Sequence, residues 1–137
     1  METITPYRLL TADQVLKDST LDIGAKTMIV KTFANLGWIS DLPHTIFVAA
    51  LCDHWEIAKN LVENGKDIDH SLTLRKLLGN SVVFKDRKSL KELCSKLLEV
   101  DPKAMARLNA WAVQYGQENG MDVKNYSDLC SCKLTMK

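Results

Sequence analysis

The chain has 137 residues, of which 46% are apolar and 26% charged, a composition that excludes disorder over its whole length. Its formal net charge of +1 does not indicate nucleic acid or a membrane as a partner. The longest uncharged apolar run, residues 46–52, is too short to cross a bilayer, and the N-terminus has no apolar run of signal-peptide length. We therefore expect one helical domain over residues 1–137, located in the reducing cytoplasm or in the nucleus, with no membrane contact.

The charges are unevenly distributed between the two halves of the chain. Residues 1–70 contain six Lys/Arg and ten Asp/Glu, a balance of −4, whereas residues 71–137 contain twelve and seven, a balance of +5. The two halves are therefore expected to attract each other, either within one fold or across a homodimer.

The first part of the chain predicts two helices before the central apolar segment. A Thr-x-x-Gln capping box at residues 11–14 predicts a short helix over 12–18. Apolar residues at helical spacing predict a second helix over 22–36, which Gly37 ends as a left-handed cap. Trp38 is expected to pack back over that end.

The segment from Pro43 to Gly65 is the most apolar part of the chain, and it leaves two structures open. In one, Pro43 to Asn64 form a single continuous helix in an irregular bundle. In the other, Asp53 and His54 form a turn between two short antiparallel helices. Neither residue is glycine or proline, so the sequence does not decide between them.

The second half predicts further helices and one connector. We expect helices over residues 71–78, 86–100 and 102–117, and a weak helical turn at 126–130. Residues 80–84 combine β-branched and aromatic side chains but have no partner strand, so we expect an extended, buried connector. The ends, residues 1–10 and 132–137, are expected to be frayed.

Residues 45–69 carry a recognisable pattern of positions. These are a threonine, an alanine pair, a histidine, a Glu-Ile pair, a leucine, a glycine and two aspartates: Thr45, Ala49, Ala50, His54, Glu56, Ile57, Leu61, Gly65, Asp67 and Asp69. In this pattern the segment resembles one degenerate ankyrin repeat. It departs from the family at Ile46, Val48 and Asp53, and no regular array with a period near 33 residues is visible.

The expected fold class is therefore all-α. The first form of it is an irregular bundle of five to seven helices, and the alternative is a short degenerate ankyrin-like helical array. The resemblance implies a protein that binds other proteins through its turns and its first-helix face. On that basis the candidate exposed contact residues are Asp41, His44, Trp55 and Lys66.

The remaining candidate sites have weaker patterns. His44, Cys52, His54 and the Cys130-Ser-Cys132 tail lack the paired spacing of a zinc site, so we expect no metal. No phosphate loop or serine elbow is present, and Cys94 lies on a leucine stripe, so we expect neither an enzyme nor a cofactor.

By elimination, the sequence favours a non-catalytic protein-interaction domain, a regulator or adaptor that can self-associate as a homodimer. The alternative is a small nucleic-acid-associated protein with a basic surface within residues 75–96. The candidate phosphate contacts of that alternative are Arg75, Lys76, Lys85, Arg87, Lys88 and Lys91.

Overall fold

The computed structural model describes the backbone of residues 11–135 and the side chains of residues 11–131. This part of the chain contains no strand and forms eight α-helices and one 3-10 turn. They are α1 (Ala12–Lys17), α2 (Ile23–Asn35), α3 (Leu42–Leu51), α4 (Trp55–Asn64), α5 (Ser71–Gly79), η2 (Ser81–Val83), α6 (Arg87–Val100), α7 (Ala104–Glu118) and α8 (Tyr126–Thr135). The all-α expectation is confirmed, with one helix more than the expected maximum of seven.

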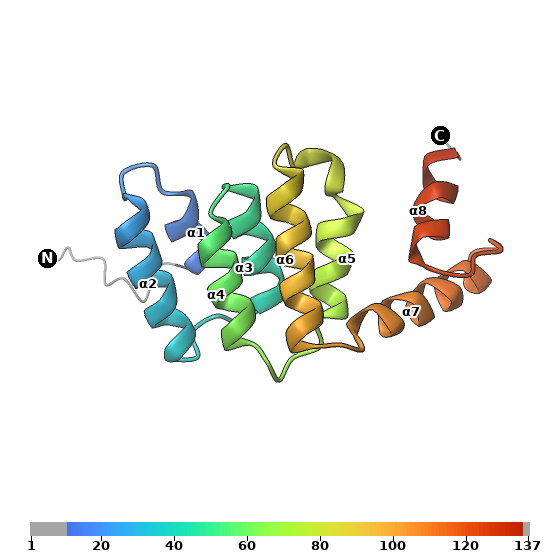
Figure 1. The fold of residues 1–137 in the computed structure, drawn as a ribbon, viewed down its shortest axis with the longest axis horizontal. Helices are drawn as coiled ribbons and strands as arrows, with labels where there is room; N and C mark the ends of the chain where they lie inside the picture. The colour runs from blue at the N-terminus through green and yellow to red at the C-terminus, as the bar shows by residue number, and fades with distance from the viewer. Residues whose placement is uncertain (1–10, 136–137) are drawn as a thin grey trace, which may run out of the picture.

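Most of the helices are arranged as a row of antiparallel pairs (Figure 1). One layer consists of α1, α3 and α5, in which α1 packs on α3 and α3 packs on α5. The second layer consists of α2, α4 and α6, in which α2 packs on α4 and α4 packs on α6. The α1–α2, α3–α4 and α5–α6 turns lie along the upper edge of the row in Figure 1, which we call the turn edge. The α7–α8 pair lies beyond α5 and leaves the direction of the row.

Short polar residues cap the starts of α1, α2, α3 and α6. The expected capping box is present, since Thr11 accepts from the backbone of Gln14 and the side chain of Gln14 accepts from the backbone of Thr11. The carboxylates of Asp22, Asp41 and Asp86 likewise accept backbone N–H groups at the starts of α2, α3 and α6.

The end of α2 also follows the sequence. Gly37 adopts a left-handed φ of 72°, and the N–H of Trp38 donates to the carbonyl of Phe33 at 2.9 Å. The indole ring of Trp38 then packs on Phe33, with ring centroids 5.6 Å apart, as expected.

The central apolar segment is a helical hairpin, so the single continuous helix from Pro43 to Asn64 is wrong. α3 ends at Leu51 and α4 begins at Trp55. Between them Asp53 has a φ of 64°, the single positive φ of a non-glycine residue in the described part of the chain. The N–H of His54 reaches back to the carbonyl of Ala49 at 2.9 Å, which closes the end of α3. Aspartate tolerates this left-handed conformation better than most residues, so no glycine is needed.

A single hydrophobic core runs along the row between the two layers. It is made mainly of aliphatic side chains from α3, α4, α5 and α6, including Ile46, Leu61, Leu74, Leu93 and Leu97, all of which are inaccessible or nearly so. The alanines of α3, at positions 49 and 50, are also buried and allow the neighbouring helices to approach closely.

The α4–α5 connection is held by close packing and a buried histidine. Gly65 has an ordinary negative φ, but a Cβ there would meet a methyl group of Leu42, so a larger residue would require that side chain to move. His70 is fully buried; its Nε2 donates to the Gly65 carbonyl at 2.7 Å, and its Nδ1 lies 3.0 Å from the hydroxyl of Thr73. Burial lowers the pKa of His70, which favours the neutral imidazole.

α7 begins two residues later than the sequence predicts. Asp101 does not cap it; its carboxylate accepts the backbone N–H of His70 and an N–H of Arg107. Arg107 also pairs with Asp69 at 2.9 Å, which ties α7 to the α4–α5 connection.

The last helix is longer than the predicted turn at 126–130, since it continues to Thr135. The expected fraying at residues 1–10, and the role of the Cys132 side chain, lie outside the described residues. No helix within residues 11–135 has the length and apolar character needed to cross a membrane.

Leu97 on α6 tests the core. It is fully buried, so Leu97→Ala is expected to lower the free energy of unfolding by about 2–5 kcal/mol, because it removes buried apolar contacts and leaves a cavity. Chemical denaturation measures this change, with exposed Ser95→Ala on the same helix as the control. Equal stability of the two variants would contradict the assignment of Leu97 to the core.

Asp53 tests the hairpin turn. Both Asp53→Gly and Asp53→Ala remove its hydrogen bond to Trp55, but only alanine brings a Cβ into the left-handed conformation. We expect Asp53→Ala to be less stable than Asp53→Gly by about 1 kcal/mol. Comparing the two denaturation midpoints isolates the backbone contribution, and an equal or reversed order would argue against a left-handed residue 53.

Candidate functional site

The α3–α4 and α5–α6 turns enclose a hollow of about 330 Å³ on the turn edge. One side is formed by the end of α3 and the turn that follows it, and the other by the segment that leads into α6. The residues that line it are Ala50, Leu51, Asp53, Trp55, Val83, Phe84, Lys85 and Asp86. Two turns about thirty residues apart in the sequence thus form one surface.

Buried aromatic rings form the base of this hollow. Trp55 is only 9% exposed, and its ring packs against Phe84 with centroids 5.7 Å apart. Its Nε1 donates to the carboxylate of Asp53 at 2.6 Å. The prediction that Trp55 is an exposed contact residue is therefore wrong: the turn at Asp53 directs the first residue of α4 inward, beneath the next turn. Trp55 lies beneath the exposed surface of the turn edge and is not part of it.

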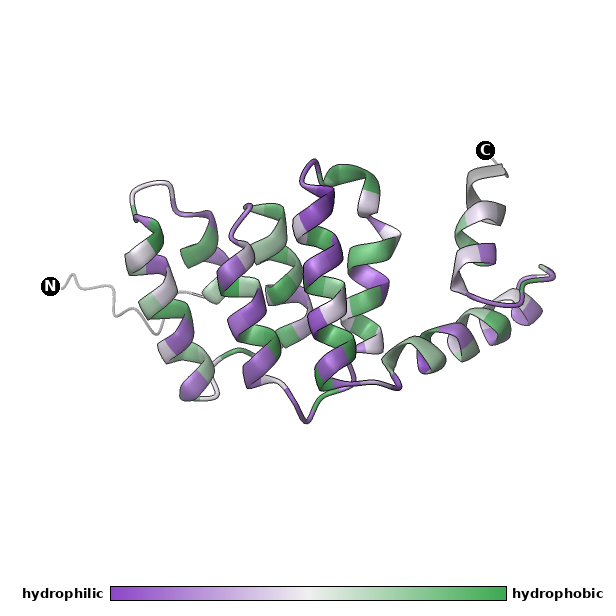
Figure 2. Cartoon of the chain, in the orientation of Figure 1, coloured by the Kyte–Doolittle hydropathy of each residue, from purple (hydrophilic) through white to green (hydrophobic). Residues whose placement is uncertain are grey.

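Aliphatic side chains form the exposed part of the turn edge. Val82 is 82% exposed, Val83 54% and Leu51 46%. The predicted buried, extended connector at residues 80–84 is therefore wrong except at Phe84, which is buried. The chain makes a 3-10 turn at Ser81–Val83, so both valines point outward, and the segment appears as a hydrophobic stretch on the upper edge in Figure 2.

The start of α6 adds charge beside these aliphatic side chains. Lys85 is exposed, and Arg87 is exposed while donating to the carbonyl of Ser81 at 2.9 Å. Asp86 accepts both the N–H and the hydroxyl of Ser89, and these hydrogen bonds lower the pKa of its carboxyl group. The first turn of α6 contains no acidic residue.

A second hollow, of about 760 Å³, follows the groove between α4 and α6 and carries both signs of charge. Lys59 pairs with Glu56 and Glu92, and Lys96 pairs with Glu63 at 2.5 Å and with Glu99. Hydrophilic residues accordingly cover this side of α4 and α6 in Figure 2. Exposed ion pairs of this kind contribute little stability, and the groove has no single sign of charge that would attract an ion.

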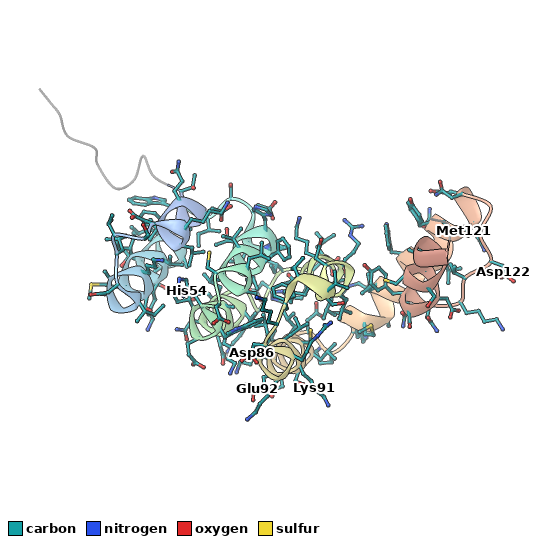
Figure 3. The ribbon with its side chains drawn as sticks, turned by 90° about the horizontal axis from the view of Figure 1, so that it is seen from above. His54, Asp86, Lys91, Glu92, Met121 and Asp122 are labelled. Carbon is teal, nitrogen blue, oxygen red and sulfur yellow. The ribbon has the colours of Figure 1, made fainter. Side chains whose placement is uncertain are left out.

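The six predicted phosphate contacts do not form one surface. Arg75 lies over the indole ring of Trp111 on α7, 4.5 Å from its centroid, and Lys76 is half-buried on α5. The other four lie together around the start of α6: Lys85, Arg87, Lys88 and Lys91. Figure 3 looks down on the turn edge and labels Lys91 on α6 with Asp86 at the start of that helix.

Asp41 and His44, two of the predicted contact residues, lie together at a different place. They line a small hollow of about 100 Å³ between α1, the α2–α3 connection and α3, together with Trp38. His44 Nε2 lies 3.3 Å from a carboxylate oxygen of Asp13, and the hydroxyl of Thr45 donates to the other oxygen at 3.0 Å. Both groups face the same carboxylate, so the cluster holds α3 to α1, and the Asp41 carboxylate caps α3.

Lys66, the fourth predicted contact residue, is exposed in the α4–α5 connection, which lies at the opposite edge of the row. The structure thus brings Asp41 and His44 together, buries Trp55 and places Lys66 apart. The aliphatic rim of Leu51, Val82 and Val83 was missed. Its signal in the sequence was the pair of valines in a connection too short for a strand.

Lys26 makes the contact that joins the first helix pair to the second. Its side chain is buried, and its Nζ donates to the carbonyl of Leu16 at 2.8 Å and to Nε2 of His54 at 3.2 Å. An ammonium group can only donate, so the ring of His54 must be neutral here. Burial, and then the charge of Lys26, lower the pKa of His54. His54 is labelled between the two pairs in Figure 3.

Cys52 and Cys94 show no sign of activation. Burial raises the pKa of Cys94 to about 11, and burial also raises that of Cys52 although Lys26 opposes it. Tyr126, beside Cys130, has a pKa raised to about 12, first by burial. Within the described residues, no three histidine, cysteine or acidic side chains gather in a group that could hold a metal ion.

No protein-family model, curated protein or solved structure matched the chain when it was compared with them.

Partly buried His54 and fully buried His70 predict a pH-dependent stability. Burial lowers the pKa of both His54 and His70, so below the ordinary value near 6.5 the unfolded chain takes up protons that the folded chain does not. The free energy of unfolding is therefore expected to be at its full value above pH 7 and to fall as the pH decreases below about 6.5.

Chemical denaturation at pH 7.5, 6.5 and 5.5 measures this dependence. In His54→Gln, one of the two contributions is removed, so the loss between pH 7.5 and 5.5 should be smaller than in the unmodified protein. The control is Asn60→Gln, which changes an exposed amide on α4 and no titratable group. A stability that does not change over this range, or a loss of the same size in His54→Gln, would contradict the role given to His54.

Proposed function

We propose that the chain is a non-catalytic protein-interaction domain, a regulator or adaptor, that binds its partner along the turn edge. The observation that carries this proposal is the exposed aliphatic rim of Leu51, Val82 and Val83, supported from beneath by buried Trp55 and Phe84. Apolar side chains exposed together on a rigid base are typical of protein-binding surfaces.

The described histidines support a non-catalytic role. Each is engaged in a structural contact: His44 with Asp13, His54 with Lys26, and His70 with the Gly65 carbonyl. None of these contacts joins a histidine to a cysteine thiol. A cytoplasmic or nuclear location remains part of this proposal.

A photo-crosslinking experiment tests the proposed function. Benzoylphenylalanine is placed at position 82 on the turn edge and, as a matched control, at Met28, an apolar residue that is 71% exposed on α2. Irradiation in cells that express the chain should give a protein adduct of defined mass from position 82 and none from position 28. The crosslinked protein is identified by mass spectrometry and bound again in purified form.

The purified partner should bind Val83→Asp at least about 10-fold more weakly than the unmodified chain, since a charge then replaces an apolar contact. An adduct with a second copy of the chain would identify the homodimer as the assembly. The same adducts from both positions, or no adduct from position 82, would contradict the proposal.

The alternative, a nucleic-acid-associated protein, is favoured by one observation: Lys85, Arg87, Lys88 and Lys91 lie around the start of α6. It predicts that binding to a 20-nucleotide single strand weakens steeply between about 50 and 200 mM salt, because phosphate contacts release counterions. Fluorescence anisotropy at both salt concentrations measures this, and protein binding that is insensitive to salt would oppose it.

A further inference from the structure

The basic residues along α6 differ in whether they form ion pairs. Deeper in the groove, Lys96 pairs with carboxylates of α4 and α6, and Lys59 of α4 pairs with Glu92. Around the start of the helix, Lys85, Lys88 and Lys91 have no ion-pair partner within the described part of the chain. The uncompensated positive charge is therefore concentrated where α6 meets the turn edge.

The direction of α6 adds to this charge. The first turn of a helix carries the positive end of the helix dipole, which favours acidic residues there. In α6 the first turn contains Arg87 and Lys88 and no acidic residue, so Asp86 at the cap is the carboxylate nearest to them in sequence. The next one along the helix, Glu92, is already paired with Lys59. Both oxygens of Asp86 are occupied by Ser89. A negatively charged group of a binding partner would therefore be attracted to the start of α6.

The aliphatic rim lies beside Lys85, whereas Lys88 and Lys91 line the groove between α4 and α6. Lys85 follows Val82 and Val83 in sequence and lines the same hollow as Leu51. We propose that the turn edge binds an acidic peptide segment of a partner protein. A large apolar side chain of the segment covers the aliphatic rim, and its flanking carboxylates face Lys85, Lys88 and Lys91. This inference rests on the proposed function and specifies the chemical class of the partner segment.

A peptide fits this surface better than a nucleic acid does. Exposed Leu51, Val82 and Val83 offer no aromatic face on which a base can stack, and Trp55 and Phe84 are buried. A nucleic-acid strand also carries charge at every phosphate and would meet the carboxylates of Asp53 and Asp86 on the same edge. A peptide can place an uncharged residue there and its acids on either side.

The test selects peptides from a displayed library of random 12-residue sequences on the full chain. The peptides retained should be enriched in Asp and Glu flanking at least one Leu, Ile, Phe or Trp. A synthetic peptide from this selection is then titrated against four variants: Val82→Asp, the double variant Lys88→Glu/Lys91→Glu, and the matched controls Met28→Asp and Lys31→Glu. Circular dichroism melting confirms that each variant is folded.

The expected result is at least 10-fold weaker binding to Val82→Asp and to the double lysine variant, and less than 2-fold change in both controls. A peptide in which lysine replaces the acids should regain binding to the double lysine variant. Selection of basic or uncharged peptides would overturn the acidic chemistry, even if crosslinking at position 82 still finds a protein partner.

Selected peptides whose binding ignores Val82→Asp would overturn the location, and the crosslinking result then decides whether the proposed function stands. A 20-nucleotide single strand and vesicles of phosphatidylserine and phosphatidylcholine are titrated alongside. If either binds more tightly than the selected peptide and depends on Val82, the partner is not a peptide and the inference is overturned.

Discussion

The fold depends on the sharp reversal at Asp53, which turns one apolar segment into two short helices facing each other. A helix of ten residues buries little surface alone and is stable only when packed against neighbours. The reversal lets α3 and α4 join separate layers, so that each can pack on the helix before and after it. It also sends Trp55 inward beneath Phe84, and this pair of rings holds the two neighbouring turns in register. The surface on the turn edge thus depends on the backbone conformation of Asp53 together with the 3-10 turn at Ser81–Val83.

Much of the fold was accessible from the sequence because local signals agree with it. The capping box at Thr11 and the left-handed Gly37 both lie where predicted, and the leucine stripe of α6 faces the core. The errors arise where a local signal is ambiguous. Asp53 is compatible with a helix interior as well as with a left-handed turn, and only the packing of α4 on α2 and α6 selects the turn. At Asp101, the carboxylate that could cap α7 is taken by His70 and Arg107, partners distant in sequence.

The candidate site was less predictable than the fold. Exposure of an apolar side chain depends on which neighbour covers it, and periodicity does not contain that information. Trp55 and Val82 show the two kinds of error. Trp55 was predicted to be exposed but is covered by the next turn, whereas Val82 was predicted to be buried but is exposed to solvent. The predicted basic residues are divided for a similar reason. Arg75 and Lys91 are sixteen positions apart, and Arg75 stacks on an indole ring of α7 while Lys91 lines the groove between α4 and α6.

The contact of Lys26 with His54 affects how the row of helix pairs unfolds. Each helix pair in such a row contacts mainly its neighbouring pairs. Cooperative unfolding of the whole row therefore depends on the contacts between each pair and the next. At the boundary of the first two pairs, a buried ammonium group depends on an uncharged imidazole. A second positive charge there would repel the first pair from the second, without touching the boundaries further along the chain. In mild acid, protonation of His54 is therefore expected to weaken the boundary between the α1–α2 and α3–α4 pairs, while protonation of His70 weakens the α4–α5 connection.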